Sequence, residues 1–319
     1  MRMIRIALAI VLGLIAEHAA AQGGEPPIRI VLPFQAGGVG DAALRMIADS
    51  MRVQLKRTVI VESRPGAAGR IGILSVKDAP ADGTVLLFTP IAPMVLFPHV
   101  YDNLPYDPMR DFQPISQVGT FDLGVAVGSQ VPVSNLKELV DWLKRHPDQA
   151  TYGTPAAGSL PHFFAVLFGR QANLDLRHVA YKGNPQAITD LIGGHLPLFF
   201  TSTQDLVEAH KAGRVRVLAT SGRARSPALP DVPTFIEDGY DIRGEGWYGI
   251  YAPTGTQPAL IAQLNRAVRE AVGTPEFGKR LTALGVQPTG TSPEEFANII
   301  KADSDLWGPV VKASGFRPE

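Results

Sequence analysis

The sequence predicts an α/β protein with two lobes, and three features of its pattern lead to this expectation. Short apolar segments rich in β-branched residues alternate with segments in which apolar residues recur at helical spacing. Several apolar segments are continuous rather than interrupted by polar residues, which is typical of parallel strands that helices cover on both faces. The alternation starts again near Asp122, so the chain contains two consecutive α/β units of similar size.

The first unit contains three expected strands and two expected helices. A helix over 42–55 is indicated by apolar residues three and four positions apart, from Leu44 to Leu55. The strands are short apolar runs bounded by polar or turn-forming residues. In chain order, the prediction is strand 28–32, helix 42–55, strand 58–61, helix 72–76 and strand 84–88.

The second unit repeats this order. Ser134 is expected to cap a helix that carries four apolar residues on one face and ends before Pro147. The other elements are predicted from the same two periodicities. They are strands 122–127, 150–153, 196–200 and 215–219, and helices 160–168, 185–192 and 203–211.

The chain closes with one expected strand and two expected helices. The strand 247–252 carries three aromatic residues that belong mainly to the core, although strand alternation could turn Trp247 toward a ligand. A helix over 258–272 follows. The last helix begins at a capping box formed by Ser292 and Glu295, with proline at its first position.

The N-terminus has the three-part layout of a secretory signal peptide. Two arginines precede an apolar run over 6–16. The small residues Ala19-Ala20-Ala21 then form a typical signal-peptidase cleavage site before Gln22. This run is short, because a membrane-spanning helix needs ~20 residues. The alternative is a buried N-terminal helix, but Glu17 and His18 would then lie in the core. We therefore expect residues 1–21 to be a signal peptide and the protein to be periplasmic.

The composition argues against several classes of function. Basic and acidic residues both number 30 and no basic block exists, so neither nucleic acid nor an anionic membrane surface is an expected partner. The chain contains no cysteine, which excludes disulfides, thiolate metal sites, cysteine nucleophiles and a lipid anchor on a cysteine. The histidines lack metal-ligand spacing. We expect a soluble, exported protein without a lipid anchor, cofactor or metal.

The loop 33–41 joins the first strand to the first helix and is the strongest candidate site. Gly37, Gly38 and Gly40 let the backbone approach a ligand closely, and a helix start offers unpaired N–H groups and a positive dipole end. This combination suits an anion, and ligands of open α/β sheets bind at the carboxyl ends of strands. The alternative is a flexible loop in which Asp41 only caps the helix.

The same loop also admits an enzymatic interpretation. Residues 38–43 match the dinucleotide-binding pattern G-x-G-x-x-A, and Glu62 follows the next strand, where a ribose-binding acid is expected. However, residues 33–36 lengthen a turn that this pattern requires to be tight, and Glu62 leads directly into another loop. Export also delivers the chain to a compartment poor in nicotinamide cofactor. A dinucleotide-binding oxidoreductase is therefore the less favoured alternative.

A second loop of small residues, 152–162, has the corresponding place in the second unit. Ser159 can cap the helix that follows, so two helix N-termini, one from each unit, could hold one anion between them. Polar residues also follow two other expected strands. These are Tyr181-Lys182-Gly183-Asn184, where Lys182 has the alternative of a plain surface lysine, and Thr201-Ser202-Thr203, where the alternative is a helix cap.

Patterns for catalysis are scarce. The chain contains no G-x-S-x-G, so a nucleophile elbow is absent. Ser159 and His162 lie too close in sequence to be interpreted as a dyad, and both are expected to line one loop. An exported hydrolytic enzyme is the remaining alternative, and it requires Ser159 and His162 to be hydrogen-bonded beside an acid.

Six motifs in fixed order, among them ESRPGAAGR at 62–70 and LPYDP at 104–108, resemble the Bug family of extracytoplasmic solute receptors. This is the receptor class associated with tripartite tricarboxylate transporters. The resemblance covers essentially the whole chain after residue 21. The motifs lie at 28–41, 61–72, 81–84, 104–108, 180–183 and 225–234.

The resemblance implies a two-lobed, type II periplasmic binding protein fold that closes on a ligand. The implied lobes are 22–121 with 249–319, and 122–248. It also implies a monomeric receptor of a small carboxylate that serves a membrane transporter pair or a sensor. Backbone N–H groups and waters of the two glycine loops would hold one carboxylate. The implied ligand-binding residues are Phe34, Gly37, Gly38, Val39, Asp41, Thr89, Ala157, Gly158, Ser159, His162, Thr201 and Ser202.

Two departures from the family pattern bear on the ligand. Members often carry Ser-Thr before the loop aspartate, where this chain has Val39 and Gly40. Members often carry Asp-Asn where this chain has Thr201 and Ser202, and the missing aspartate argues against a ligand ammonium. Val39 and Ile91 make the expected pocket more apolar. We therefore expect a monocarboxylate or dicarboxylate with an apolar or aromatic body and no amine.

Overall fold

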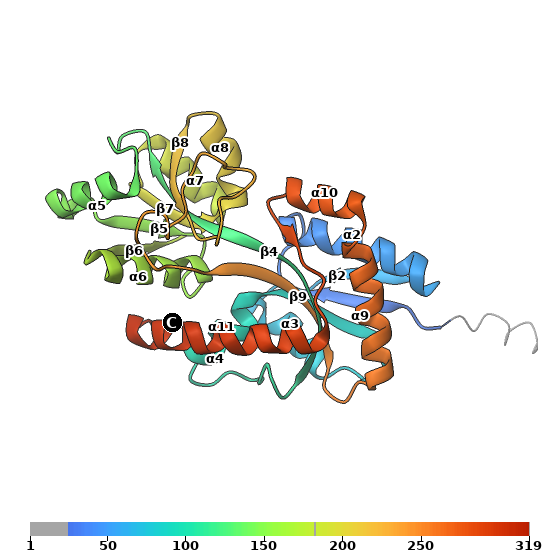
Figure 1. The fold of residues 1–319 in the computed structure, drawn as a ribbon. Helices are drawn as coiled ribbons and strands as arrows, with labels where there is room; N and C mark the ends of the chain where they lie inside the picture. The colour runs from blue at the N-terminus through green and yellow to red at the C-terminus, as the bar shows by residue number, and fades with distance from the viewer. Residues whose placement is uncertain (1–24, 182, 319) are drawn as a thin grey trace, which may run out of the picture.

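The structure, a computed structural model, describes residues 25–181 and 183–318. The predicted signal peptide, 1–21, lies outside the described residues. Figure 1 shows two α/β lobes that lie side by side and are joined by long strands. The two-lobed α/β fold predicted from the sequence is confirmed.

Lobe 1 is built on three parallel strands covered by helices. The side chains of the strands 28–32 and 85–90 are largely buried, which explains the continuous apolar runs of the sequence, whereas those of the edge strand 59–63 are half-buried or exposed. The elements before the chain leaves this lobe are β1 (Ile28–Leu32), α2 (Val39–Leu55), β2 (Val59–Ser63), η1 (Ala67–Gly69), α3 (Arg70–Lys77), β3 (Val85–Pro90), η2 (Ala92–Leu96) and α4 (Phe97–Val100). After its return the chain adds α9 (Pro258–Val272), α10 (Pro275–Ala283), β10 (Gln287–Pro288) and α11 (Pro293–Ser314).

Lobe 2 repeats the design with a second set of parallel strands. The sequence placed a single helix at 203–211, whereas the structure has a 3₁₀ turn followed by a short α-helix. The elements are α5 (Leu136–Arg145), η3 (Pro147–Gln149), β5 (Thr151–Thr154), α6 (Leu160–Ala172), β6 (Arg177–Ala180), α7 (Asn184–Gly193), β7 (Leu198–Ser202), η4 (Thr203–Asp205), α8 (Val207–Lys211) and β8 (Val215–Thr220).

Two long strands, β4 (Phe112–Gly128) and β9 (Glu245–Pro253), connect the lobes (Figure 1). β4 pairs with β9 as far as Asp122 and with β7 from Leu123 onward, so its partner changes where it enters lobe 2. The sheet order is β2-β1-β3-β9-β4-β7-β5-β6, with β8 and β10 also paired to β4. The sequence predicted a strand from 122 only, and residues 112–121 are a correction to that prediction.

The carboxyl ends of the parallel strands in each lobe point toward the other lobe. In lobe 2, β7 runs antiparallel to β4 and ends at Ser202, opposite Leu123 at the crossing point. In lobe 1, β3 runs antiparallel to β9 and ends at Pro90, opposite Tyr248 near the start of β9. The remaining strands β1, β2, β5 and β6 are parallel to these. The loops that follow the two sets of strands therefore face each other.

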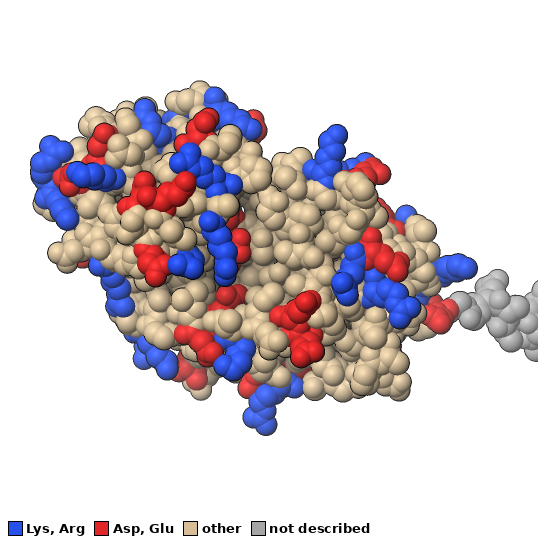
Figure 2. All heavy atoms as spheres, viewed as in Figure 1, with Lys and Arg blue, Asp and Glu red and all other residues tan. Residues whose placement is uncertain are grey.

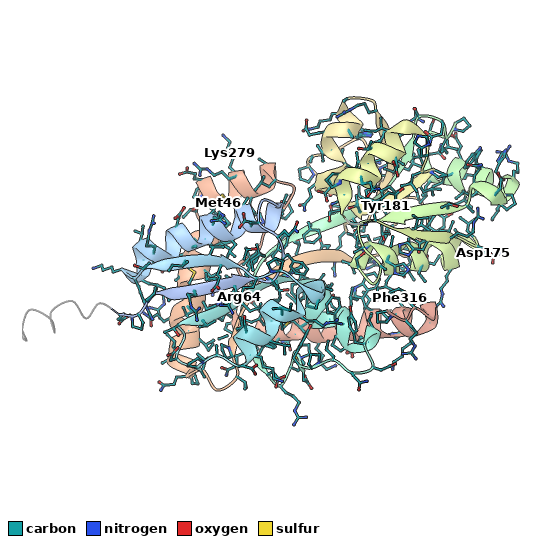
Figure 3. All side chains as sticks on the ribbon, turned by 180° about the vertical axis from the view of Figure 1, so that it is seen from behind. Met46, Arg64, Asp175, Tyr181, Lys279 and Phe316 are labelled. Carbon is teal, nitrogen blue, oxygen red and sulfur yellow. The ribbon has the colours of Figure 1, made fainter. Side chains whose placement is uncertain are left out.

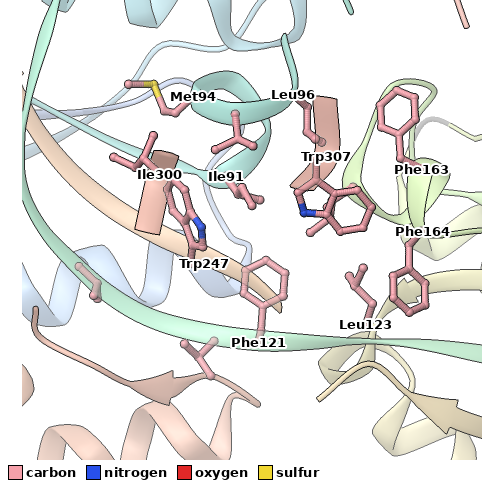
Figure 4. Packing of buried hydrophobic residues seen from close by; sticks show 14 of the residues in the cluster. Ile91, Met94, Leu96, Phe121, Leu123, Phe163, Phe164, Trp247, Ile300 and Trp307 are labelled. Carbon is pink, nitrogen blue, oxygen red and sulfur yellow. The ribbon is translucent and has the colours of Figure 1, made fainter. Parts of the chain in front are cut away.

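The last helix, α11, lies along both lobes (Figure 1) and packs against β4 and α4 as well as α6 of lobe 2. Its predicted capping box is confirmed, because Ser292 accepts from the N–H of Glu295 and Glu295 accepts from the N–H of Ser292. Trp307 of α11 is fully buried. Figure 4 shows its ring among Leu96 of lobe 1 and Phe164 of lobe 2, which belong to one hydrophobic cluster.

Smaller differences from the sequence prediction concern caps and short elements. The cap of α5 is Asn135, whose side chain accepts from the N–H of Glu138, rather than Ser134. The short elements β6 and α10 were not predicted, because four and nine residues are too few to establish a period. Among the described residues, no helix combines the length and apolarity needed to cross a bilayer.

Candidate functional site

The N-terminus of α2 is the part of lobe 1 best suited to hold an anion. The first backbone bond of this helix runs from the N–H of Ala42 to the carbonyl of Gly38. The N–H groups of Val39, Gly40 and Asp41 therefore have no helical acceptor. The cap residue Gly38 offers no side chain to occupy them. Exposed N–H groups at the positive end of a helix dipole bind negative groups.

Asp41 shapes this loop from within. Its Oδ2 accepts hydrogen bonds from the N–H of Gly37 at 3.0 Å and from Arg45 Nε at 3.1 Å. Its Oδ1 lies 3.1 Å from Arg45 Nη2, an ion pair without hydrogen-bond geometry. Gly37 has φ +97°, a conformation that favours glycine. Because Arg45 balances the charge of Asp41, the buried carboxylate does not leave the loop negative toward an incoming anion.

Two other predicted site residues of lobe 1 support the loop. Phe34 is half-buried beside Gly69, and its carbonyl accepts from Ser63 Oγ at 2.8 Å. Thr89 is fully buried, and its hydroxyl donates to the carbonyl of Pro90 at 3.3 Å. In this conformation both residues stabilise the loops at the carboxyl edge of the sheet.

The N-terminus of α6 faces lobe 1 in the corresponding way. Ser159 is its cap residue, yet its hydroxyl donates to the carbonyl of Ala156 at 2.7 Å instead of accepting from the helix. The N–H groups of Leu160 and His162 have no helical acceptor, and Ala157 is exposed in the loop before them. Two N-termini, those of α2 and α6, thus lie on facing edges of the two lobes.

A pair of stacked histidines lies beneath this second loop. The rings of His162 and His178 are 4.0 Å apart and nearly parallel, and His162 Nδ1 accepts from the N–H of Gly158 at 3.1 Å. Thr154 Oγ1 lies 2.6 Å from His178 Nε2 and donates to the carbonyl of Ala156. Burial, helped by His178, lowers the pKa of His162 to about 3, and burial lowers that of His178 to about 4. Both rings are therefore neutral near pH 7, as the bond from the N–H of Gly158 to Nδ1 of His162 requires.

We expect these histidines to reduce stability in acid. Because their pKa values are lower in the folded chain than the ordinary 6.5, the unfolded chain binds more protons, and their contribution to stability is lost as pH falls from about 6.5 toward 4. The variant His178→Phe keeps a ring in the stack but cannot be protonated. Between pH 7.5 and 5, the midpoint of thermal unfolding should fall by a few degrees more in the wild type than in this variant.

The comparison with His178→Phe isolates the contribution of His178 to the pH dependence of stability. Burial raises the pKa of Asp122, Asp205 and Asp303 to about 6, and these carboxyl groups change stability in the opposite direction over the same range. Wild type and variant share these carboxyl groups, so their effect on the unfolding midpoint is the same in both proteins and does not contribute to the difference between the two midpoint shifts. Equal shifts of the two midpoints with pH would contradict the prediction.

The other loops of lobe 2 complete the facing edge. Thr201 is buried and its hydroxyl donates to Asn184 Oδ1 at 2.8 Å, which links the end of β7 to the start of α7. Ser202 is half-buried and its side chain makes no cap bond to η4. Figure 3 shows Tyr181, in the loop before α7, on the side of lobe 2 toward lobe 1.

The structure adds Tyr248, which the sequence had assigned to the core, and corrects the place of Trp247. Trp247 is buried on the α11 side, where its Nε1 donates to Asp303 Oδ2 at 2.7 Å, so it does not face a ligand. Tyr248, the next residue on β9, is half-buried and lies against Gly40 at the start of α2. Strand alternation allowed Trp247 to face a ligand, whereas the structure turns the next residue, Tyr248, toward the loops.

The geometry does not form the hydrolytic site that was considered as an alternative. That site requires Ser159 to bond to His162, whereas Ser159 Oγ donates to Ala156 and His162 Nδ1 accepts from Gly158. Figure 2 shows acidic and basic residues interspersed over one face of the molecule, without a broad patch of one sign. The site instead consists of backbone donors at two facing helix ends.

Two α/β lobes joined by two strands, with helix N-termini facing each other across the junction, define a solute-binding protein that holds its ligand between lobes. Residues 43–316 match the profile of the family described as "Tripartite tricarboxylate transporter family receptor". The chain belongs to this receptor family, and the resemblance drawn from its motifs is confirmed.

Relatives and solved structures agree with this assignment. Protein BugT of Bordetella pertussis is 30% identical over 95% of this chain and 94% of its own length. The structure described as "R. palustris Rpa4515 with adipate" has a TM-score of 0.84 and 27% identity, and covers 93% of this chain and 100% of its own. "MatC (Rpa3494) from Rhodopseudomonas palustris with bound malate" has a TM-score of 0.79 and 26% identity, and covers 90% of this chain and 99% of its own. The structure of the periplasmic binding protein BugD has a TM-score of 0.80 and 29% identity, and covers 93% of this chain and 100% of its own.

Proposed function

We propose that this chain is a periplasmic receptor that captures a small carboxylate between its two lobes. The observation that carries the proposal is the N-terminus of α2, where the N–H groups of Val39, Gly40 and Asp41 are left without helical acceptors. A carboxylate can accept several of these bonds, and hydrogen bonds to a charged group contribute about 1.5–3 kcal/mol each. The N-terminus of α6 supplies donors from the opposite side.

The solved structures of two relatives support a carboxylate ligand. Their descriptions name adipate and malate, both dicarboxylates. Extended to this chain, the likeness favours a mono- or dicarboxylate. Val39 is half-buried at the start of α2 and Ile91 is buried after β3, so apolar side chains surround this end of the site and favour an apolar or aromatic ligand body.

A ligand amine finds no free carboxylate in the two glycine loops, and Asp205, the acid that follows β7 in η4, is buried, which raises its pKa to about 6. The carboxylate of Asp41 is taken by Arg45 and the N–H of Gly37, and the end of β7 carries Thr201 and Ser202 instead of an acid. Placing an ammonium group between the lobes without a paired charge is unfavourable. Amino acids should therefore bind less well than plain acids of similar size.

A thermal-shift screen tests this proposal. The mature protein is heated with adipate, malate or benzoate, with glutamate and phenylalanine as the amino-acid counterparts, and with adipamide as the matched neutral control. At about 100 times its Kd a ligand stabilises the folded state by about 2.7 kcal/mol, which raises the melting temperature by several degrees. We expect at least one plain acid to do so and adipamide not to. Stabilisation by amino acids but by none of the plain acids would contradict the proposal.

We further propose that the protein acts as a monomer after export, without a cofactor, and delivers its ligand to a membrane transporter pair or a sensor. Lobe 1, comprising 22–121 and 249–319, and lobe 2, comprising 122–248, would move as units about β4 and β9. The change of strand partner at Asp122 and Leu123 supports the first of these boundaries.

A further inference from the structure

Tyr248 lies where the ligand carboxylate of the proposed function would enter. A Cβ atom built on Gly40 would lie 2.9 Å from Cε1 and 3.3 Å from Cζ of Tyr248, closer than side chains tolerate. The missing side chain of Gly40 therefore lets the phenol end of the ring approach the first turn of α2. These are the turn and the N–H groups that the proposed function assigns to the carboxylate.

The ring of Tyr248 is held firmly, and only its hydroxyl end is available. Phe88 stacks on it at a centroid distance of 5.4 Å and an angle of 13°, and Phe121 lies 5.1 Å away. Tyr248 is half-buried as a whole. Burial raises the pKa of Tyr248 to about 12, so the phenol keeps its proton and acts as a donor at any physiological pH.

A residue of lobe 2 approaches the same phenol. The side chain of Gln204 in η4 lies beside the phenol, and its interaction with the phenol oxygen opposes the rise of the pKa of Tyr248 that burial causes. The Cβ and Cα of Gln204 lie against Gly285 of lobe 1. The phenol therefore stands at the junction of the lobes, beside the helix end.

We propose that Tyr248 is a specificity-determining residue whose phenol O–H donates a hydrogen bond to the ligand carboxylate held at the N-terminus of α2. The inference rests on the proposed function. In this chain neither Val39 nor Gly40 supplies a hydroxyl at the loop. Tyr248 supplies one instead, because its ring extends from β9 into the space that the missing side chain of Gly40 leaves. A single donor aimed at one carboxylate oxygen favours an ionised acid over its ester or amide.

The test compares Tyr248→Phe with wild type, using the plain acid that stabilises the wild type and its methyl ester. The variant keeps the ring and its contacts with Phe88, Phe121 and Gly40, so the fold is retained. We expect the affinity for the acid, measured by calorimetry, to fall about tenfold, which corresponds to one charged hydrogen bond of about 1.4 kcal/mol. The affinity for the ester should change less than twofold. Tyr240→Phe, which removes a phenol from a ring packed on Phe168, is the matched control and should bind as wild type does.

The variant Gln204→Ala separates ligand contact from contact between the lobes. If the phenol acts on the ligand, Gln204→Ala keeps most of the affinity and its effect adds to that of Tyr248→Phe. Equal losses in the two variants that do not add would overturn the proposal, because the phenol would then act through Gln204. Wild-type affinity in Tyr248→Phe would also overturn it. A wild type that binds no plain acid would instead contradict the proposed function, so the two failures are distinguishable.

Discussion

Replacing Trp307 by alanine is expected to lower the free energy of unfolding by about 3–5 kcal/mol, the range for truncating a large buried aromatic side chain. Trp307 is fully buried, and its ring lies against Gly244, where an added Cβ would come within 2.6 Å of Cζ2. Figure 4 places it where α11 meets Leu96 of lobe 1 and Phe164 of lobe 2. The cavity would therefore open at the place where α11 connects the lobes.

Chemical denaturation followed by circular dichroism measures this effect. Leu306→Ala is the matched control, because Leu306 precedes Trp307 on the same helix but is 46% exposed, and a surface truncation changes stability by roughly 0.5 kcal/mol. Trp307→Phe should cost less than alanine, since it keeps a ring and removes an indole N–H that has no partner. A loss of less than about 1 kcal/mol in Trp307→Ala would show that α11 does not depend on this contact.

Replacing Val39 by proline is expected to weaken carboxylate binding by roughly 10- to 100-fold, the equivalent of one hydrogen bond to a charged group. Val39 is the first residue of α2, and proline at this position removes an N–H while keeping the helix. Gly38 before it has φ −84° and ψ 174°, the extended conformation that proline requires of its predecessor. The change thus deletes one proposed donor without disturbing the fold.

The matched control is Val39→Ala, which shortens the side chain but keeps the N–H. Calorimetric titration with the acid identified by the thermal-shift screen should give near wild-type affinity for alanine and a large loss for proline. Circular dichroism should show equal helix content in both. If the two variants bind equally well, the N–H of Val39 does not hold the carboxylate, and the first turn of α2 is not the anion site.

Elements with a strong local pattern were predicted well from the sequence. The strand 28–32 and the helix 258–272 have the predicted bounds, because a continuous apolar run and a clear helical period need no distant partner to be recognised. The capping box of α11 was likewise predicted, since both of its bonds lie within four residues.

The first half of β4 was missed for a physical reason. Two register shifts interrupt its pairing with β9, so its side chains do not alternate regularly. Ser116 is fully buried, and its hydroxyl donates to the carbonyl of Thr291, while Thr291 Oγ1 accepts from the N–H of Gln117. Polar residues in a buried strand resemble a loop until the distant residue that satisfies them is known.

The sequence by itself determined the class of the site: two glycine-containing loops, each leading from a strand into a helix and each suited to a negative group. The roles of individual side chains were decided only by the tertiary structure. Asp41 is turned inward by Gly37 and Arg45, and His162 is held beneath its loop by Gly158. Tyr248 enters the site from a strand more than 200 residues away in sequence. Helix ends and turns follow from neighbouring residues, whereas the side of a strand that faces a ligand depends on which distant elements cover its other side.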